Sequence, residues 1–123
     1  MGTKILLVDD NEDLLKITQI ILKAQGYDIF LATTIEEAAR KIRIHQPALV
    51  LLDVSVCEKE DGRLYCQQLK EEAATKDIRI ILMSGNEYDG HEWNGADDFL
   101  QKPFDYTILV DKVAQQLVPS VSV

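Results

Sequence analysis

The apolar residues of this chain occur in short continuous runs, separated by longer segments in which they recur at helical spacing. A run of about five apolar residues, bounded by polar residues or proline, is typical of a strand buried on both faces. The run at 48–53 stands out because it ends abruptly in one carboxylate, Asp53. The pattern predicts five strands, at residues 4–8, 27–32, 48–53, 79–83 and 99–101.

The segments between these strands have the periodicity and the end signals of amphipathic helices. Asn11 or Asp10, Thr34 and Asp105 are the expected N-caps of three of them. Residues 86–94 are polar with an internal glycine and predict at most a short helix. The expected inward-facing positions are Leu14, Ile17, Ile21 and Leu22; Ile35, Ala38, Ala39 and Ile42; Leu64, Leu69 and Ala73; and Leu109, Val110, Val113 and Leu117.

Regular alternation of strands and helices indicates right-handed crossovers, a parallel sheet and helices on both of its faces. The predicted fold class is therefore α/β, with a doubly wound, five-stranded parallel sheet. We expect a single domain over residues 1–123, with its core at about 4–117 and a tail at 118–123.

Composition narrows the classes of function. The formal net charge of −8 and the sequence pI of about 4.6 argue against a direct nucleic-acid surface, which needs clustered Lys and Arg. Cys57 and Cys66 are too few and too oddly spaced for a zinc or dithiol motif, so we interpret them as free thiols. We see no signal-peptide core and no transmembrane span, and expect a cytoplasmic protein without membrane contact.

Polar side chains follow four of the predicted strands directly: Asp9 and Asp10, Asp53, Ser84, and Lys102. Ligands of open parallel sheets bind at the carboxyl ends of the strands. The side chains would share one crevice if the first and third strands are neighbours. By position alone Asp53 could equally cap the next turn, the two acids after the first strand could cap a helix, and Ser84 and Lys102 could lie in a turn and on the surface. Their joint placement favours a site.

Such a site predicts a specific chemistry. Three clustered carboxylates raise each other's pKa unless they share a cation, and hard oxygen ligands favour Mg²⁺. A lysine ammonium and a hydroxyl opposite the metal can hold the remaining oxygens of a phosphoryl group. Asp53, on the middle strand, is the natural carboxylate nucleophile and would form an aspartyl phosphate.

Short motifs occur at these four strand ends and in the segment that leads into the last strand. The motifs are Val8-Asp9-Asp10, Leu51-Leu52-Asp53, Met83-Ser84-Gly85, Gly95-Ala96-Asp97-Asp98-Phe99 and Lys102-Pro103-Phe104. Together and in this order they resemble the receiver domain of bacterial two-component response regulators. The resemblance runs from about Lys4 to Leu117, and it implies a flavodoxin-like sheet with strand order 2-1-3-4-5.

The resemblance implies a role for each site residue. Asp53 matches the phosphoacceptor, which takes a phosphoryl group from a histidine of a sensor histidine kinase or a phosphotransfer protein. Mg²⁺ would be held by Asp10, Asp53 and the backbone carbonyl of Ser55, with Asp9 acting through water.

The remaining matches concern the switch. Ser84 would move to hydrogen-bond one phosphoryl oxygen, Lys102 would pair with another, and Phe99 matches the aromatic switch position that turns inward. The resemblance also implies a cis peptide bond between Lys102 and Pro103.

The sequence departs from the family pattern in two places. Cys57 stands where a proline is usual, and Asp61-Gly62 comes about one residue late, which affects the shape of the loop after Asp53. The stretch from Ser84 to Lys102 is shorter than usual by about four residues, or one helical turn. We therefore expect a truncated or irregular fourth helix and an altered signalling face.

The leading hypothesis is a phosphorylatable switch that catalyses only its own phosphorylation and dephosphorylation and is not otherwise an enzyme. Its expected partners are the kinase, a downstream protein of unknown identity and, after phosphorylation, a second copy of the chain. One alternative is a pseudo-receiver that binds partners without accepting phosphate. Another is a phosphatase with an aspartate nucleophile. That family requires a second Asp at the position of Ser55. A flavodoxin-like nucleotide binder lacks support, because no glycine-rich phosphate loop follows the first strand.

Overall fold

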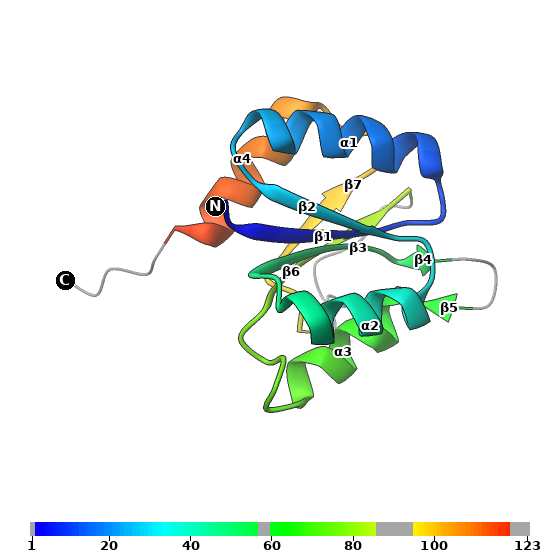
Figure 1. Ribbon diagram of the computed structural model, residues 1–123. Helices are drawn as coiled ribbons and strands as arrows, with labels where there is room; N and C mark the ends of the chain where they lie inside the picture. The colour runs from blue at the N-terminus through cyan, green and yellow to red at the C-terminus, as the bar shows by residue number, and fades with distance from the viewer. Residues whose placement is uncertain (1, 57–59, 86–94, 119–123) are drawn as a thin grey trace.

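The computed structural model describes residues 2–56, 60–85 and 95–118 and has three layers, with a parallel sheet between two pairs of helices (Figure 1). The sheet strands are β1 (Lys4–Val8), β2 (Asp28–Ala32), β3 (Leu49–Asp53), β6 (Arg79–Ser84) and β7 (Asp98–Gln101). Their order, β2-β1-β3-β6-β7, is the expected order 2-1-3-4-5 when only the sheet strands are counted. All four neighbouring pairs are parallel.

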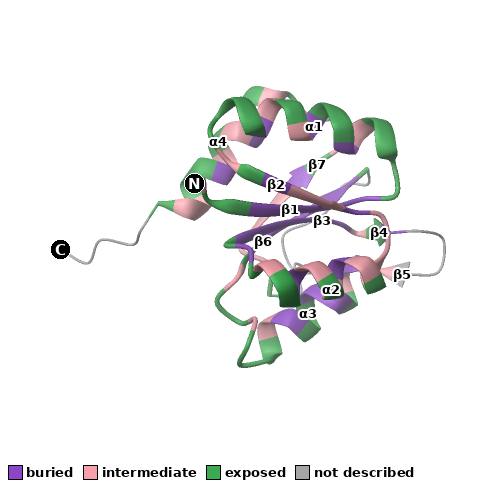
Figure 2. Ribbon diagram, viewed as in Figure 1, coloured by how far each residue is buried: buried purple, intermediate pink, exposed green. Residues whose placement is uncertain are grey.

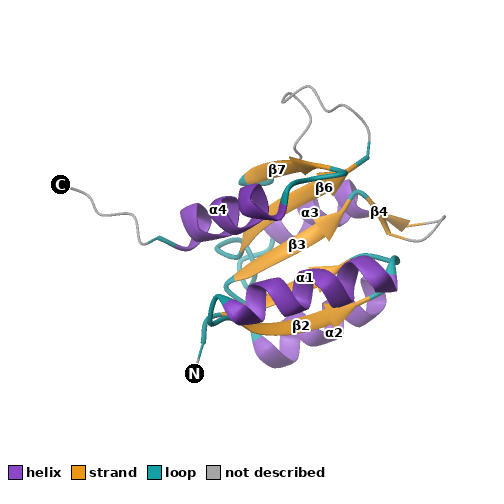
Figure 3. Ribbon diagram, turned by 90° about the horizontal axis from the view of Figure 1, so that it is seen from above, coloured by secondary structure: helices purple, strands orange, loops and turns teal. Residues whose placement is uncertain are grey.

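Two helices cover each face of the sheet. They are α1 (Glu12–Ala24), α2 (Ile35–His45), α3 (Gly62–Glu71) and α4 (Tyr106–Leu117). Helices α1 and α4 lie on one face and α2 and α3 on the other (Figure 1). Seen from above, α1 lies over β1 and β2, and α4 lies nearer β3 and β6 (Figure 3). The predicted fold class is thus confirmed.

The central strands are buried on both faces, as their continuous apolar sequences predict (Figure 2). Side chains alternate between the two cores, so that Leu51 packs with α1 and α4 while Leu52 packs with α2 and α3. Register places Val8 beside Leu52 and Asp53 beside Met83. The strands therefore end together at one edge of the sheet.

Side-chain caps begin the helices where the sequence predicts. The Asn11 carboxamide oxygen accepts from Leu14 N–H at 3.1 Å, the Thr34 hydroxyl accepts from Glu37 N–H at 3.0 Å, and Asp105 caps α4. The Glu37 carboxylate accepts from the N–H of Thr33 at 2.8 Å. The returning bond of the capping box therefore goes to the residue before the N-cap and not to Thr34 itself.

The expected inward faces of two helices were partly wrong. In α1, Ile17 is 48% exposed, and Leu15 with Leu22 faces the sheet instead. In α3, Leu64 is 57% exposed, while Tyr65, Cys66 and Leu69 are buried, and Ala73 lies beyond the helix end. Both helices carry apolar residues on two sides, so periodicity alone could not decide which side meets the sheet.

A small ribbon follows β3 where only a loop was expected. Strands β4 (Ser55–Val56) and β5 (Glu60–Asp61) pair antiparallel, with Ser55 opposite Asp61. The predicted short helix at 86–94, Cys57 and the tail beyond Val118 lie outside the described residues. Among the helices that the structure describes, none combines the length and apolar character needed to cross a bilayer.

Cys66 is fully buried against α2 and the sheet, and burial raises the pKa of its thiol to about 11, a rise that Asp97 supports and Lys70 opposes. In a Cys57→Ser variant, we expect this thiol to react with a disulfide reagent at least about 100-fold more slowly in the native protein than in urea, because the thiolate is the reactive form. The time course of thiol release measures this ratio. Similar rates in the two conditions would contradict the buried position of Cys66.

Candidate functional site

The polar residues predicted at the strand ends meet at one edge of the sheet. Asp9 directly follows β1, Asp53 ends β3, Ser84 ends β6 and Lys102 directly follows β7. Asp9 and Asp53 are only 1% and 6% exposed, and Ser84 is equally buried. Buried carboxylates are rare unless they are paired or bind a cation, so this edge is a candidate for chemistry.

Three carboxylates form one cluster at this edge. Oxygen atoms of Asp9, Asp10 and Asp53 all lie within 4.8 Å of one another, and Asp10 is the exposed member. Carboxylate oxygens are the ligands that Mg²⁺ prefers in proteins, and one exposed member leaves room for the waters that this ion retains. The donor set therefore fits a divalent cation of this kind.

Lys102 already supplies one positive charge to the cluster. Its ammonium donates to Asp9 Oδ2 at 2.6 Å and lies 3.4 Å from Asp53 Oδ1. Burial alone would lower the pKa of Lys102, but the hydrogen bond to Asp9 and the charges of Asp53 and Asp9 raise it above its ordinary value. Lys102 is therefore a fixed cation, held between two acids. The peptide bond from Lys102 to Pro103 is cis, as the resemblance implied.

The charge on Asp53 remains incompletely compensated. Burial and the charge of Asp9 raise the pKa of Asp53 from 3.8 to about 6, although Lys102 and the backbone N–H of Ser55 pull it down. Asp9 has its second oxygen occupied, because Oδ1 accepts from the N–H of Asn11 at 3.0 Å. A further cation near Asp53 would be stabilising, which is the second observation that fits Mg²⁺ to the cluster.

Ser84 and Phe99 lie on adjacent strands beside the acids. Phe99 pairs in register with Leu82, two residues before Ser84, so alternation places the side chains of Ser84 and Phe99 on the same face of the sheet. Phe99 is half-buried and packs against the core beneath α2 and α3. The carbonyl of Ser84 accepts from Lys102 N–H at 2.7 Å. This hydrogen bond connects the end of β6 to Lys102.

Sequence reasoning missed the part that Gly62 plays in shaping the site. Its N–H donates to the carbonyl of Val54 at 2.8 Å, and a Cβ at this position would lie 2.0 Å from the backbone oxygen of Asp53. The first turn of α3 thus packs directly on the end of β3. A glycine at the first position of a helix, immediately after the capping residue Asp61, was the available signal.

Comparisons with known proteins agree with this arrangement. The family model described as response regulator receiver domain matches residues 5–114. A crystal structure of a two-component response regulator from Clostridium difficile shares 30% sequence identity and a TM-score of 0.86, covering 98% of this chain and 100% of that one. The receiver domain of NtrX from Brucella abortus shares 26% identity and a TM-score of 0.81, covering 94% and 99%.

Curated relatives are longer than this chain. The alkaline phosphatase synthesis transcriptional regulatory protein PhoP of Bacillus subtilis is 38% identical over 107 residues, which cover 85% of this chain and 44% of PhoP. The DNA-binding dual master transcriptional regulator RpaA of Synechocystis is 32% identical over 116 residues, covering 89% and 47%. The chain thus spans about half the length of these relatives.

Proposed function

Because the chain belongs to the response regulator receiver domain family, we propose that it is a phosphorylatable switch of two-component signalling, with Asp53 as the phosphoacceptor. The observation that carries the proposal is the position of Asp53, which is buried at the carboxyl end of β3 with Lys102 and two further acids around it. The domain is a signalling domain, and the only chemistry proposed for it is its own phosphorylation and dephosphorylation.

In the proposed reaction, a carboxylate oxygen of Asp53 attacks the phosphorus of a phosphohistidine on a sensor kinase or phosphotransfer protein. The phosphorus–nitrogen bond breaks, and its electron pair returns to the imidazole, which takes up a proton. Lys102 would pair with a phosphoryl oxygen, and the 3.4 Å between its ammonium and Asp53 Oδ1 supports this role. A high pKa keeps this ammonium charged throughout.

Asp9, Asp10, Asp53 and the backbone carbonyl of Ser55 would hold Mg²⁺, with Asp9 acting through water. When bound, the ion neutralises charge on the carboxylates and on the phosphoryl oxygens. The clustered oxygens and the raised pKa of Asp53 support this assignment.

Ser84 and Phe99 are the proposed switch residues. Ser84 ends the strand beside β3, and its hydroxyl would hydrogen-bond the new phosphoryl group. Phe99 shares its face of the sheet and is only half-buried, so an inward rotation would bury more of its ring. Signalling then passes through a contact with a downstream protein or a second copy of the chain. The acidic charge supports a protein partner over direct nucleic-acid binding. The proposed reaction would take place in the cytoplasm.

The proposal is tested by intact mass after incubation with acetyl phosphate and Mg²⁺. We expect a single phosphoryl adduct, which is lost when Mg²⁺ is removed and lost in an Asp53→Asn variant. An Asp111→Asn variant, which removes an exposed acid of α4, serves as the matched control and should be labelled like the parent. Absence of the adduct, under conditions that label another receiver domain, would favour the pseudo-receiver alternative.

Mg²⁺ should also stabilise the chain without any phosphodonor. A ligand that binds only the folded state raises the free energy of unfolding, by about 1 kcal/mol at several times its dissociation constant. We expect a rise of a few degrees in the melting temperature at millimolar Mg²⁺, measured by thermal unfolding. Asp10→Asn should remove most of this rise, whereas Asp13→Asn, an exposed acid in the first turn of α1, should retain it. Equal responses in the two variants would contradict the assigned metal site.

A further inference from the structure

The described part of the chain contains a groove at the edge of the sheet opposite to Asp53. Its volume is about 920 Å³, and it is lined by the last turns of α2, α3 and α4, by the residues that precede β3 and by the 72–79 segment. Ala48, on its wall, and Asp53 are five residues apart along an extended strand, which separates the two sites by about 16 Å. Volumes of roughly 300–1,000 Å³ are typical of sites for small molecules.

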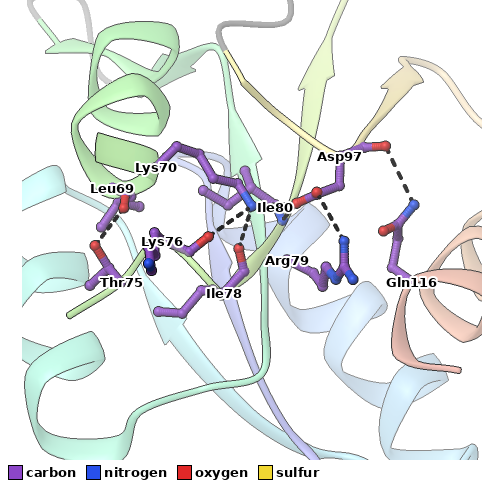
Figure 4. A network of polar contacts seen from close by, with 9 residues as sticks. All are labelled: Leu69, Lys70, Thr75, Lys76, Ile78, Arg79, Ile80, Asp97 and Gln116. Atoms are coloured by element: carbon purple, nitrogen blue, oxygen red, sulfur yellow. Dashed lines mark hydrogen bonds and ion pairs between the residues drawn. The ribbon is translucent and has the colours of Figure 1, made fainter. Parts of the chain in front are cut away.

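The floor of the groove is held in place by a hydrogen-bond network (Figure 4). Thr75 Oγ1 donates to the Leu69 carbonyl at 2.6 Å, and Lys70 Nζ donates to the Ile78 carbonyl at 2.8 Å and to Asp97 Oδ2 at 2.7 Å. These bonds tie the 72–78 segment to α3 and to the start of β7. The groove is therefore largely preformed, which lowers the entropic cost of binding a ligand.

Asp97 fixes the remaining wall. It accepts from the backbone N–H of Ile80 at 2.8 Å and from Arg79 Nη1 at 3.2 Å, and its carbonyl accepts from Gln116 Nε2 at 3.4 Å (Figure 4). Arg79 and Gln116 both line the groove. Arg79 is thus already paired with Asp97, so its charge is not available to a ligand.

One buried polar group on the wall lacks a partner. Tyr65 is 9% exposed, yet its hydroxyl makes no hydrogen bond to any residue within 2–56, 60–85 or 95–118. Buried tyrosine hydroxyls normally find a partner. Burial and the charge of Glu72 raise the pKa of Tyr65 to about 12, opposed by Arg43, so the hydroxyl stays neutral and can donate a hydrogen bond to a ligand.

Two residues of opposite charge in the groove act on this hydroxyl. Arg43 of α2 and Glu72, the C-cap of α3, both line the groove and both act on Tyr65. Neither makes an ion pair with another residue in the described ranges. Arg43, Glu72 and Asp77 are all exposed, but Asp77 is not among the charges that act on Tyr65, and Arg79 pairs with Asp97. The wall between them is apolar and includes Ala39, Ile42, Leu69, Ile78 and Leu117.

We propose that this groove binds a small zwitterion with an apolar side chain, of the class of the apolar α-amino acids. Its carboxylate would accept from the Tyr65 hydroxyl and pair with Arg43, its ammonium would pair with Glu72, and its side chain would cover the apolar wall. A plain carboxylate would meet Glu72 unfavourably, and a plain amine would leave Tyr65 without an acceptor. The assignment rests on the groove alone and is independent of phosphorylation at Asp53.

Three matched probes test the charge pattern: L-tryptophan, indole-3-propionate, which lacks the amine, and tryptamine, which lacks the carboxylate. Each is titrated into the ¹⁵N-labelled full chain, and amide shifts are followed. We expect L-tryptophan to bind most tightly and to shift the amides of Gln68, Thr75 and Ile78, but not those beside Asp53.

Variants then separate the two charges. Arg43→Gln should weaken L-tryptophan and indole-3-propionate about tenfold and should not weaken tryptamine. Glu72→Gln should weaken L-tryptophan and tryptamine and should strengthen indole-3-propionate, because its carboxylate no longer meets a like charge. Tyr65→Phe should weaken the two carboxylates. Arg40→Gln and Glu71→Gln, neighbouring exposed residues outside the groove, are the controls.

Three outcomes would overturn the proposal. The first is the absence of any amide shift at roughly 10 mM L-tryptophan, which is about ten times the dissociation constant of a site with millimolar affinity. The second is equal binding of all three probes, unaffected by the variants, because this would show only apolar contact. The third is a change in the groove amides with protein concentration and no probe, because a second copy of the chain would then be the occupant.

Discussion

Replacing Asp53 with asparagine is expected to stabilise the metal-free protein by about 3 kcal/mol at neutral pH while it removes the proposed phosphoacceptor. The carboxyl group has its pKa raised from 3.8 to about 6 in the folded chain, first by burial and then by the charge of Asp9. Ionised Asp53 therefore costs folding free energy. Asparagine is nearly isosteric, and Lys102 keeps its bond to Asp9 at 2.6 Å.

The sign of the pH dependence follows from the two pKa values. Well below pH 3.8 the carboxyl is protonated in both states, and Asp53 carries no penalty. Between about pH 4 and 6 the unfolded state releases the proton first, so the penalty grows, and above pH 6 it is complete. The difference in unfolding free energy between Asp53→Asn and the parent should thus rise from about 0.5 kcal/mol at pH 4 to about 3 kcal/mol at pH 7.

Urea unfolding at pH 4, 5.5 and 7 without Mg²⁺ measures this difference. Asp111→Asn makes the same change in net charge at an exposed position of α4 and should show no comparable rise. Added Mg²⁺ should narrow the gap, because the parent gains a cation that the variant binds less well. If Asp53→Asn were less stable than the parent at pH 7, the neighbours of Asp53 would stabilise its negative charge more fully than the raised pKa indicates.

Replacing Gly62 with alanine should cost about 3 kcal/mol of unfolding free energy and also disturb phosphorylation. The new Cβ would lie 2.0 Å from the backbone oxygen of Asp53, 3.0 Å from its carbonyl carbon and 3.1 Å from the Cα of Val54. All three neighbours are backbone atoms, so no side chain can move aside. Either α3 or the end of β3 must shift, and a shift of β3 would displace Asp53, the proposed phosphoacceptor.

Gly85→Ala is the matched control, because a Cβ at that position would meet no atom within 4 Å. We expect Gly85→Ala to stay within about 0.5 kcal/mol of the parent. Urea unfolding gives the two stabilities, and the rate of labelling by acetyl phosphate shows whether the site has moved. If Gly62→Ala matches Gly85→Ala in both measurements, the close packing of α3 on β3 is wrong.

Local sequence signals were sufficient for the elements and for their sheet. Apolar runs predicted the buried strands, Thr34 and Asp105 were correct caps, and alternation of strands with helices predicted a parallel sheet. These features depend on residues that are close together along the chain, so they can be recognised directly in the sequence. The predicted inward faces of the helices were partly wrong because they do not depend on local residues alone. In α1, whether Ile17 or Leu15 faces the sheet depends on the residues that pack against the helix.

For the site, the sequence by itself determined which polar groups stand at the strand ends, since that needs only the strand boundaries and a common direction. The tertiary structure decided their charges and contacts. Lys102 and Asp9 are 93 positions apart, and their 2.6 Å bond, the burial that raises the pKa of Asp53, and the approach of Gly62 all arise from packing. The groove beside Tyr65 has the same origin, because three helix ends remote in sequence enclose it. Desolvation and charge proximity depend on distances between distant segments, and only the folded chain brings those segments together.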